Sequence, residues 1–385
     1  MAGAPLASPP GAALRRAAAI VDLGAVARNC ARLRDKLDGA ELCAVVKADG
    51  YGHGAVACAE AALMGGAARL AVATANEAVE LRDGGIDASM LVMGALAPAE
   101  LREAVGARAD IVCWHTSFVS DVAAAADRAG VTVGIHSKFD SGMGRLGTRD
   151  EYEALAVLDA AAASDGLRPA GLMTHLATAD EADPGFMNEQ LDRFQPVVDR
   201  ARQSHLGLTV HAANSAAALR EPRARFDMAR CGIAIYGLDP FQRDPAEHGL
   251  EPALRLESYV TEVKRFEQGD SAGYGRTWRA PEATSVAVLP IGYGDGYRRG
   301  LSNRADVLIG GRRYPLAGTV SMDNITVDAG SEGSVRAGQP AVLIGADGGE
   351  RILAEELARA LGTINYEITC GLTARVPRVH AGAPA

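Results

Sequence analysis

The sequence predicts an α/β fold: a parallel (β/α)8 barrel of the TIM type, followed by a mostly β C-terminal domain. Between residues 41 and 236, eight short apolar runs alternate with turns and with Ala-rich stretches of helical period. The runs are apolar throughout, which is typical of parallel strands buried on both faces, and eight such strands close a barrel. Beyond residue 252 the runs are short, β-branched and separated by Gly-rich turns, which favours a β domain.

The eight runs define the expected strands of the barrel. They are ELCAVVK ending at Lys47, RLAVAT from Arg69, SMLVMG from Ser89, DIVCWH from Asp110, VTVGIHSK from Val131, PAGLMTH ending at His175, LTVHAAN ending at Asn214, and MARCGIAIYG ending at Gly237. An open doubly wound sheet is the alternative. Such a sheet usually binds a nucleotide through a GxGxxG turn after its first strand, and the turn ADGYGHG is a poor match.

The domain boundaries follow from changes in composition. We expect a disordered tail over residues 1–12, the barrel over 13–240 and the β domain over 241–380, with a first strand at about 16–22 that could pack on the C-terminal domain. The segment LDPFQRDPAEHGLEP, rich in proline and charge, is interpreted as a linker or a domain boundary. ILAEELARALG predicts one helix in the β domain, and the terminal AGAPA is expected to be disordered.

Composition excludes several classes of function. The 385 residues are 48% hydrophobic and carry a net charge of -9, so no partner nucleic acid is expected. No apolar run approaches the ~20 residues that cross a bilayer, and the N-terminus lacks the basic start of a signal peptide. The six cysteines are scattered without metal-ligand spacing, which indicates reduced, buried thiols in a cytoplasmic protein and no metal site.

Polar residues gather where the predicted strands end, and the C-terminal ends of the strands carry the functional groups in such barrels. They are Lys47, Lys138, Asp140, Arg145, His175, Asn214, Ser215 and Arg230. Each has an ordinary structural explanation when taken alone. Together, a lysine, arginines, a histidine and a serine at one rim, beside glycines, indicate an anionic ligand and amine chemistry.

Lysine chemistry near neutral pH usually proceeds through a Schiff base with an aldehyde. Pyridoxal 5′-phosphate is an aldehyde that also carries a phosphate. Ser215, Gly232 and Ile233 could hold that phosphate through a hydroxyl and backbone N–H groups.

The motifs of the whole chain, from about Arg16 to Arg378, resemble those of one family in order. They are AVVKADGYGHG, HSKFDSGMGRLG, MTHLATADE, HAANSAAAL and MARCGIAIYGLDP in the first domain, and SAGYGRTW, PIGYGDGY, GTVSMDN and INYEI with RVPR in the second. The family is that of the alanine racemases, isomerases that depend on pyridoxal 5′-phosphate. The resemblance implies a homodimer with shared active sites and D-alanine production for peptidoglycan in the cell wall.

The resemblance also implies roles for individual residues at the cofactor. Lys47 would bind the aldehyde, and Arg230 would face the pyridine nitrogen and leave it unprotonated, because arginine keeps its proton. That arrangement would favour proton exchange over transamination. The residues implied to hold the phosphate are Tyr51, Ser215, Gly232, Ile233 and Tyr366, with Asn214 and His175 completing the cofactor site.

Racemisation requires two bases that flank the α-carbon. By resemblance they are Lys47 and Tyr274, with Tyr274 reaching the active site of the partner subunit. His175 would contact both Tyr274 and Arg230 and help the phenol act as a base. Arg145 and the backbone at Met322 would hold the substrate carboxylate, and Tyr293 would line the entrance.

Some alternatives stay open at this point. Lys138 corresponds to a lysine that is carbamylated in some family members, and a simple charge near Asp140 is the other interpretation. Ser321 stands where the family often has cysteine, with little expected effect. A racemase of broader specificity or a decarboxylase on the same barrel, a non-catalytic carrier of the same cofactor, and a phosphate-binding barrel without that cofactor are the other candidate functions.

Overall fold

The computed structural model describes residues 16–382, which divide into two compact units. One unit comprises residues 26–235. The other comprises residues 16–25 together with 236–382. The predicted tail 1–12 lies outside the described residues.

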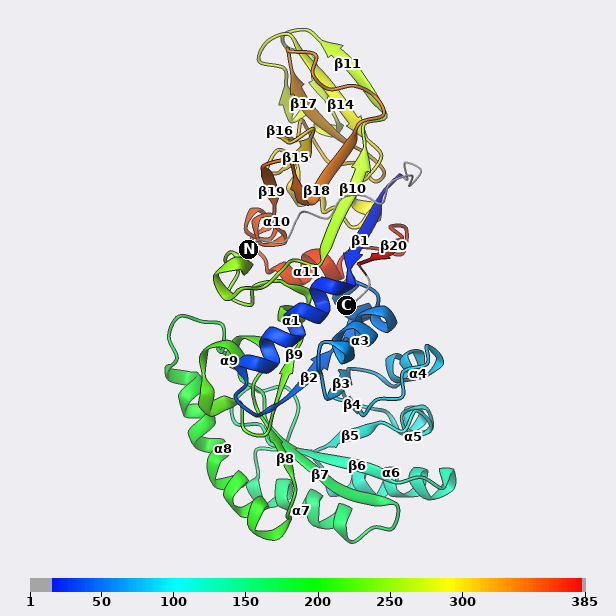
Figure 1. Ribbon diagram of the computed structural model, residues 1–385, viewed down its shortest axis with the longest axis vertical. Helices are drawn as coiled ribbons and strands as arrows, with labels where there is room; N and C mark the ends of the chain where they lie inside the picture. Colours follow the sequence, from blue (N-terminus) through cyan, green and yellow to red (C-terminus); the bar gives the residue numbers. More distant parts are fainter. Residues whose placement is uncertain (1–15, 383–385) are drawn as a thin grey trace. The chain divides into compact units, whose positions relative to one another are not determined.

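The first unit is built on eight parallel strands with helices on the outer side (Figure 1). The strands are β2 (Glu41–Val45), β3 (Arg69–Val72), β4 (Met90–Val92), β5 (Asp110–Cys113), β6 (Val133–Lys138), β7 (Leu167–Met173), β8 (Thr209–His211) and β9 (Met228–Cys231), in the order β8-β7-β6-β5-β4-β3-β2-β9. Backbone hydrogen bonds of 3.0 Å from Asp227 N to Val210 O and from Arg230 N to Ala213 O join the two ends. The predicted barrel is therefore confirmed, and each predicted run overlaps one strand.

Seven helices cover the strands of the barrel. They are α3 (Ala55–Met64), α4 (Ala75–Asp83), α5 (Leu101–Gly106), α6 (Thr116–Ala129), α7 (Glu151–Ala162), α8 (Gly185–Ser204) and α9 (Ser215–Arg220). α1 (Leu23–Lys36) precedes β2, and a short helical turn, α2 (Lys47–Gly52), follows it. β6 and β9 are buried along their whole length, although β6 ends in His136, Ser137 and Lys138 and β9 contains Arg230.

The second unit is mostly β, as predicted. Its largest sheet has the order β16-β15-β18-β10-β1-β20, with β19 paired to β18. The strands are β1 (Ala18–Asp22), β10 (Leu254–Tyr259), β11 (Glu262–Phe266), β12 (Ser271–Ala272), β13 (Trp278–Arg279), β14 (Thr284–Leu289), β15 (Asp306–Ile309), β16 (Arg312–Pro315), β17 (Ile325–Gly330), β18 (Pro340–Asp347), β19 (Glu350–Ile352) and β20 (Arg378–Ala381). β1 lies between β10 and β20. The predicted helix is α10 (Ala354–Leu361), and α11 (Asn365–Cys370) follows it.

Three expectations from the sequence are corrected. Ala381, expected to be disordered, ends β20 and pairs with Asp22 of β1. The proline-rich segment is no loose linker, because Asp239 in it is buried and donates its backbone N–H to Glu355 Oε1 at 2.9 Å. Five cysteines are buried as expected, but Cys370 is exposed because it ends α11, where Ile368 and Thr369 take the buried face.

Two features are absent from the described residues. Between residues 16 and 382, no helix is long and apolar enough to cross a membrane. The same residues contain no group of three or more His, Cys, Asp or Glu side chains that could hold a metal ion.

Candidate active site

Lys47 begins a turn of left-handed backbone directly after β2. Ala48, Asp49 and Tyr51 have φ of 52°, 53° and 53°, which glycine adopts freely but which costs other residues about 1–2 kcal/mol each. Strain of this kind persists only where the surroundings hold it, and it clusters at functional sites. The turn therefore fixes the position of Lys47 and Tyr51 relative to the barrel.

Glu77 is one of the groups that hold this turn. Its Oε1 accepts a hydrogen bond from Ala48 N at 2.7 Å, and its Oε2 accepts from Ala73 N at 2.7 Å. The same side chain closes a capping box with Thr74 at the start of α4. The TANE motif predicts such a cap from sequence, but the contact with Ala48 could not be read from it.

A small polar cradle lies between Tyr51, Ser215 and the backbone at Gly232. Ser215 Oγ accepts hydrogen bonds from Gly232 N at 3.0 Å and Ala234 N at 3.4 Å, so its own O–H is available as a donor. A Cβ at position 232 would lie 2.3 Å from the Tyr51 hydroxyl, so only glycine fits there. The N–H groups of Gly232 and Ala234 are used in these bonds, so the two hydroxyls and the backbone N–H of Ile233 are the suitable donors for a phosphate.

Asn214 lies beside this cradle. Its Oδ1 accepts from Ala217 N at 3.0 Å and caps α9, which orients Ser215 at the first position of that helix. Ile233, the other predicted phosphate residue, follows Gly232 and is buried. Asn214, Ser215, Gly232 and Ile233 are thus brought together with Tyr51, as the sequence predicted.

Arg230 is a buried cation on β9 with no carboxylate at ion-pair distance in the described part of the chain. Its Nη1 donates to His211 Nδ1 at 2.7 Å, and its Nη2 donates to the carbonyls of Thr174 and Ala212 at 2.9 and 3.0 Å. Burial lowers the pKa of Arg230 to about 10, so it keeps its proton at pH 7. Its Nε–H is the one guanidinium donor to which residues 16–382 offer no hydrogen-bond acceptor.

His175 contacts Arg230, as predicted: its Nδ1 lies 3.2 Å from Nη2. Burial, with Arg230 and Lys138 nearby, holds the pKa of His175 well below its ordinary value. The imidazole is therefore neutral at pH 7, and its Nδ1 can accept a hydrogen bond from the guanidinium.

Lys138 ends β6 as a second buried cation. Burial, together with Arg230 and Arg145, lowers its pKa to about 8, and it forms no ion pair with any residue in the range 16–382. The Asp140 carboxylate accepts from Gly142 N at 3.1 Å, Gly144 N at 3.0 Å and Arg149 Nε at 3.1 Å. It forms no ion pair with Lys138, although its negative charge acts to raise the pKa of that lysine.

The loop that Asp140 holds presents Arg145. This side chain is exposed, and within the described chain its guanidinium has no hydrogen bond or ion pair. A guanidinium without a protein partner is suited to binding the carboxylate of a ligand. The structure thus gives the barrel rim four cations, Lys47, Lys138, Arg145 and Arg230.

The remaining candidates belong to the second unit. The Tyr274 side chain is 73% exposed between β12 and β13, and its carbonyl accepts from Thr319 Oγ1 at 2.7 Å. Tyr293 N donates to Ser321 O at 3.0 Å, which places Tyr293 beside the loop of Met322. Tyr293 and Met322 are also exposed, whereas Tyr366 on α11 is half-buried. The residues 319–322 therefore support the backbone of both tyrosine turns.

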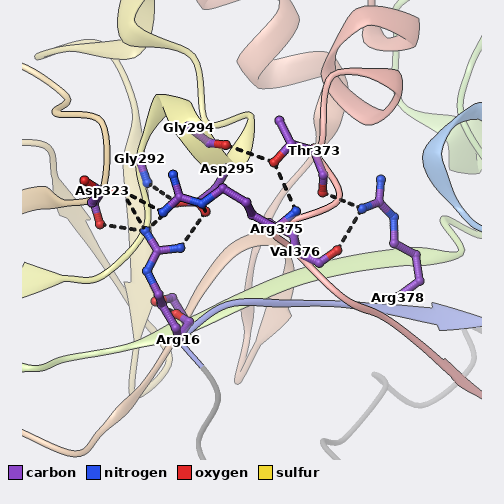
Figure 2. A network of polar contacts seen from close by, with 10 residues as sticks. Arg16, Gly292, Gly294, Asp295, Asp323, Thr373, Arg375, Val376 and Arg378 are labelled. Carbon is purple, nitrogen blue, oxygen red and sulfur yellow. Dashed lines mark hydrogen bonds and ion pairs between the residues drawn. The ribbon is translucent and has the colours of Figure 1, made fainter.

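A network around Asp295 holds the Tyr293 turn (Figure 2). The buried Asp295 carboxylate accepts from Gly292 N at 2.9 Å and from Arg16 Nη2 at 2.9 Å, and Arg375 Nε lies 3.4 Å away. Both arginines also approach Asp323. The turn is thus fixed by a carboxylate whose charge is compensated.

Three functional candidates were missed by the sequence interpretation. Asp110, His136 and His211 connect to Arg230 inside the barrel. His136 lies two residues before Lys138 on the same strand, and this spacing puts both side chains on one face. The spacing of His136 and Lys138 could be read from the sequence, but the contact of His136 with His211 could not.

The barrel residues fit pyridoxal 5′-phosphate. The site offers a lysine for the aldehyde, hydroxyl and N–H donors for the phosphate, and the Nε–H of Arg230, which has no acceptor among the described residues, for the ring nitrogen.

Comparisons with known proteins agree with this set of groups. The family models for the alanine racemase N-terminal and C-terminal domains match residues 21–240 and 253–380. An alanine racemase of Beutenbergia cavernae is 43% identical over 372 residues, which are 95% of this chain and 98% of that protein. The structure of alanine racemase from D-cycloserine producing Streptomyces lavendulae has a TM-score of 0.91 at 36% identity, over 96% of this chain and 98% of that one. The alanine racemase structure from Streptomyces coelicolor gives 0.90 at 38% identity, over 96% and 98%. The chain belongs to the alanine racemase family of isomerases.

Proposed function

We propose that this chain interconverts L-alanine and D-alanine with pyridoxal 5′-phosphate, using Lys47 and Tyr274 as its two bases. The observation that carries the proposal is the convergence of Lys47, the phosphate cradle at Gly232 and the buried Arg230 at one end of the barrel. When bound, the cofactor supplies an electron-withdrawing ring that acidifies the α-hydrogen of an amino acid attached to it.

The cofactor is held by residues of the barrel in this proposal. Lys47 binds the aldehyde, and Ser215, Gly232 and Ile233 hold the phosphate with Tyr51 and Tyr366. Asn214 orients Ser215 through its cap of α9. Arg230 would face the ring nitrogen and would leave it without a proton, because a guanidinium does not give up its own.

The proton moves on two faces of the α-carbon. Lys47 takes or returns it on one face, and Tyr274 of the partner subunit acts on the other. The neutral His175 supports the exchange because it can accept a hydrogen bond without adding charge. Arg145 pairs with the substrate carboxylate, assisted by the backbone at Met322, and Tyr293 lines the entrance. The working form is a homodimer with composite sites.

Lys138 is proposed to be carbamylated. The reaction requires a neutral amine, and a pKa of about 8 leaves a substantial neutral fraction at pH 7. The added carboxylate would give Arg145 the anionic neighbour that Asp140, paired with Arg149, does not provide.

D-alanine for peptidoglycan is the proposed biological product. Location in the cytoplasm, expected from the scattered cysteines, stays a prediction.

Two variants test the assignment of the bases. Lys47→Ala is expected to remove the visible absorbance of the bound cofactor and to lower racemisation by ~10³-fold or more. Tyr274→Phe is expected to keep that absorbance but to block exchange of the α-hydrogen with solvent deuterium from one enantiomer far more than from the other.

The control is Tyr152→Phe, which changes a tyrosine of similar exposure, 71%, on α7. It is expected to behave as the wild type. Racemisation at the wild-type rate in Tyr274→Phe would contradict the role of this tyrosine as a base.

A further inference from the structure

Four side chains form a continuous polar chain through the barrel, from Asp110 at the start of β5 to Arg230 on β9. Arg230 Nη1 lies 2.7 Å from His211 Nδ1, and His211 Nε2 lies 2.9 Å from His136 Nδ1. His136 Nε2 is 3.5 Å from Asp110 Oδ2, so the carboxylate acts on it mainly through its charge. Both histidines and Arg230 are buried.

The two ends of this series of side chains, Arg230 and Asp110, determine where the protons of the two histidines lie. A guanidinium only donates, so His211 Nδ1 must accept and its proton must be on Nε2. His136 Nδ1 must then accept from His211, which puts the His136 proton on Nε2, facing a carboxylate that only accepts. The tautomers of both histidines are therefore assigned by their partners, and the opposite tautomer of His211 would bring two N–H donors together at 2.7 Å.

Both rings are neutral, which this arrangement requires. Burial, with Arg230 beside it, holds the pKa of His211 well below its ordinary value. Burial also lowers the pKa of His136, although Asp110 acts in the opposite direction. Asp110 itself stays charged: burial raises its pKa, but His136, Arg168 and Arg69 outweigh that effect and lower it.

Two glycines leave space for the side chains of His136 and Asp110. A Cβ at position 171 would lie 2.3 Å from His136 Nδ1, and a Cβ at position 134 would lie 2.2 Å from Asp110 Oδ1. Neither glycine has a positive φ, so space and not backbone conformation requires them. The strands β6 and β7 are thus built to admit this His136 and Asp110 geometry.

We propose that His136 and Asp110 are positioning residues for Arg230, although neither contacts the cofactor site. They hold His211 in the tautomer that accepts from Arg230, and His211 in turn holds the guanidinium in the position where it would face the ring nitrogen of the cofactor. This inference rests on the proposed cofactor site. Without His136 and Asp110, Arg230 would leave that position and would no longer keep the ring nitrogen unprotonated, and transamination would increase relative to racemisation.

The test compares His136→Leu with His136→Asn in the enzyme loaded with pyridoxal 5′-phosphate. Leucine offers no acceptor to His211 Nε2–H, whereas asparagine Oδ1 occupies about the position of Nδ1 and can accept. The dissociation constant of the cofactor is measured by absorbance titration, and pyridoxamine 5′-phosphate formed per racemisation event is measured during turnover with alanine.

For His136→Leu we expect weaker cofactor binding and a higher ratio of transamination to racemisation, each by roughly tenfold or more. For His136→Asn both quantities should return to within about threefold of the wild type. A purely structural role would lower stability and turnover in both variants without changing the ratio. Asp110→Asn removes the negative charge beside His136 and should shift the ratio of transamination to racemisation in the same direction. This variant replaces His136→Leu in the test if His136→Leu does not fold.

The matched control is His205→Leu. His205 Nε2 lies 2.9 Å from Asp159 Oδ1, a histidine and aspartate pair between α7 and α8 that has no contact with Arg230. It should leave the ratio unchanged. A wild-type enzyme that neither binds the cofactor nor racemises alanine would refute the proposed function, whereas wild-type values in His136→Leu with a working wild type would refute only the positioning role.

Discussion

The two units each bury a charged group, but only the second unit places opposite charges beside it. In the barrel, Arg230 is surrounded by carbonyls and neutral imidazoles, so its positive charge is hydrogen-bonded but not compensated. In the second unit, Asp295 is buried between Arg16 and Arg375, so its negative charge is neutralised (Figure 2). A compensated charge holds a turn in place, whereas an uncompensated charge is costly for the fold and is available to a ligand.

The largest expected effect is the loss of activity when the uncompensated charge is removed. Arg230→Met should lower racemisation by ~10²-fold or more and weaken cofactor binding, because a preorganised donor at the ring nitrogen is lost. Steady-state rates and absorbance titration measure both effects. Arg200→Met, which removes a surface arginine paired with Glu151, is the control and should leave both unchanged.

The compensated charge should matter first for stability. Asp295→Asn removes the ion pairs with Arg16 and Arg375 at a buried position and should lower the free energy of unfolding by about 1–3 kcal/mol. Asp323→Asn loses pairs with the same arginines at a half-exposed position and should cost at most about 0.5 kcal/mol. Urea denaturation of the two variants separates them, and equal losses would contradict the contrast.

Lys138 is a second uncompensated charge in the barrel, and its removal should stabilise the protein. Its folded pKa of about 8 lies below the ordinary 10.5, so the native state carries a penalty for the charge at all pH values below about 8. Lys138→Met should therefore be more stable than the wild type by ~1–3 kcal/mol at pH 7 in buffer free of carbon dioxide.

The difference should shrink as the pH rises above 8, where the folded wild type loses its proton before the unfolded chain does. Urea denaturation at pH 7 and pH 9.5 measures this change. Bicarbonate at pH 7 should also reduce the difference if the lysine is carbamylated. A variant less stable than the wild type at pH 7 would show that the charge is compensated after all.

The sequence predicted the barrel because strands buried on both faces require uniform apolar runs, and it predicted the rim because polar residues directly follow those runs. Lys47 and Ser215 were found in this way, and Arg230 was found within the eighth run. His136 and His211 were missed because a histidine within a buried strand has no distinguishing pattern until its partner is known.

The left-handed turn after Lys47 also could not be predicted. Ala48, Asp49 and Tyr51 are not glycines, so their positive φ depends on tertiary contacts such as that with Glu77. A local sequence pattern indicates which backbone conformation a residue prefers. A strained conformation depends instead on tertiary contacts with residues distant in the sequence.

The most direct test of the account is the circular dichroism of an L-alanine solution incubated with the purified protein and pyridoxal 5′-phosphate, with total alanine assayed at the end. The signal is expected to decay to zero while alanine is conserved, and Lys47→Ala is expected to leave the signal unchanged. A constant signal with the cofactor-loaded wild type would contradict the racemisation of alanine by this site.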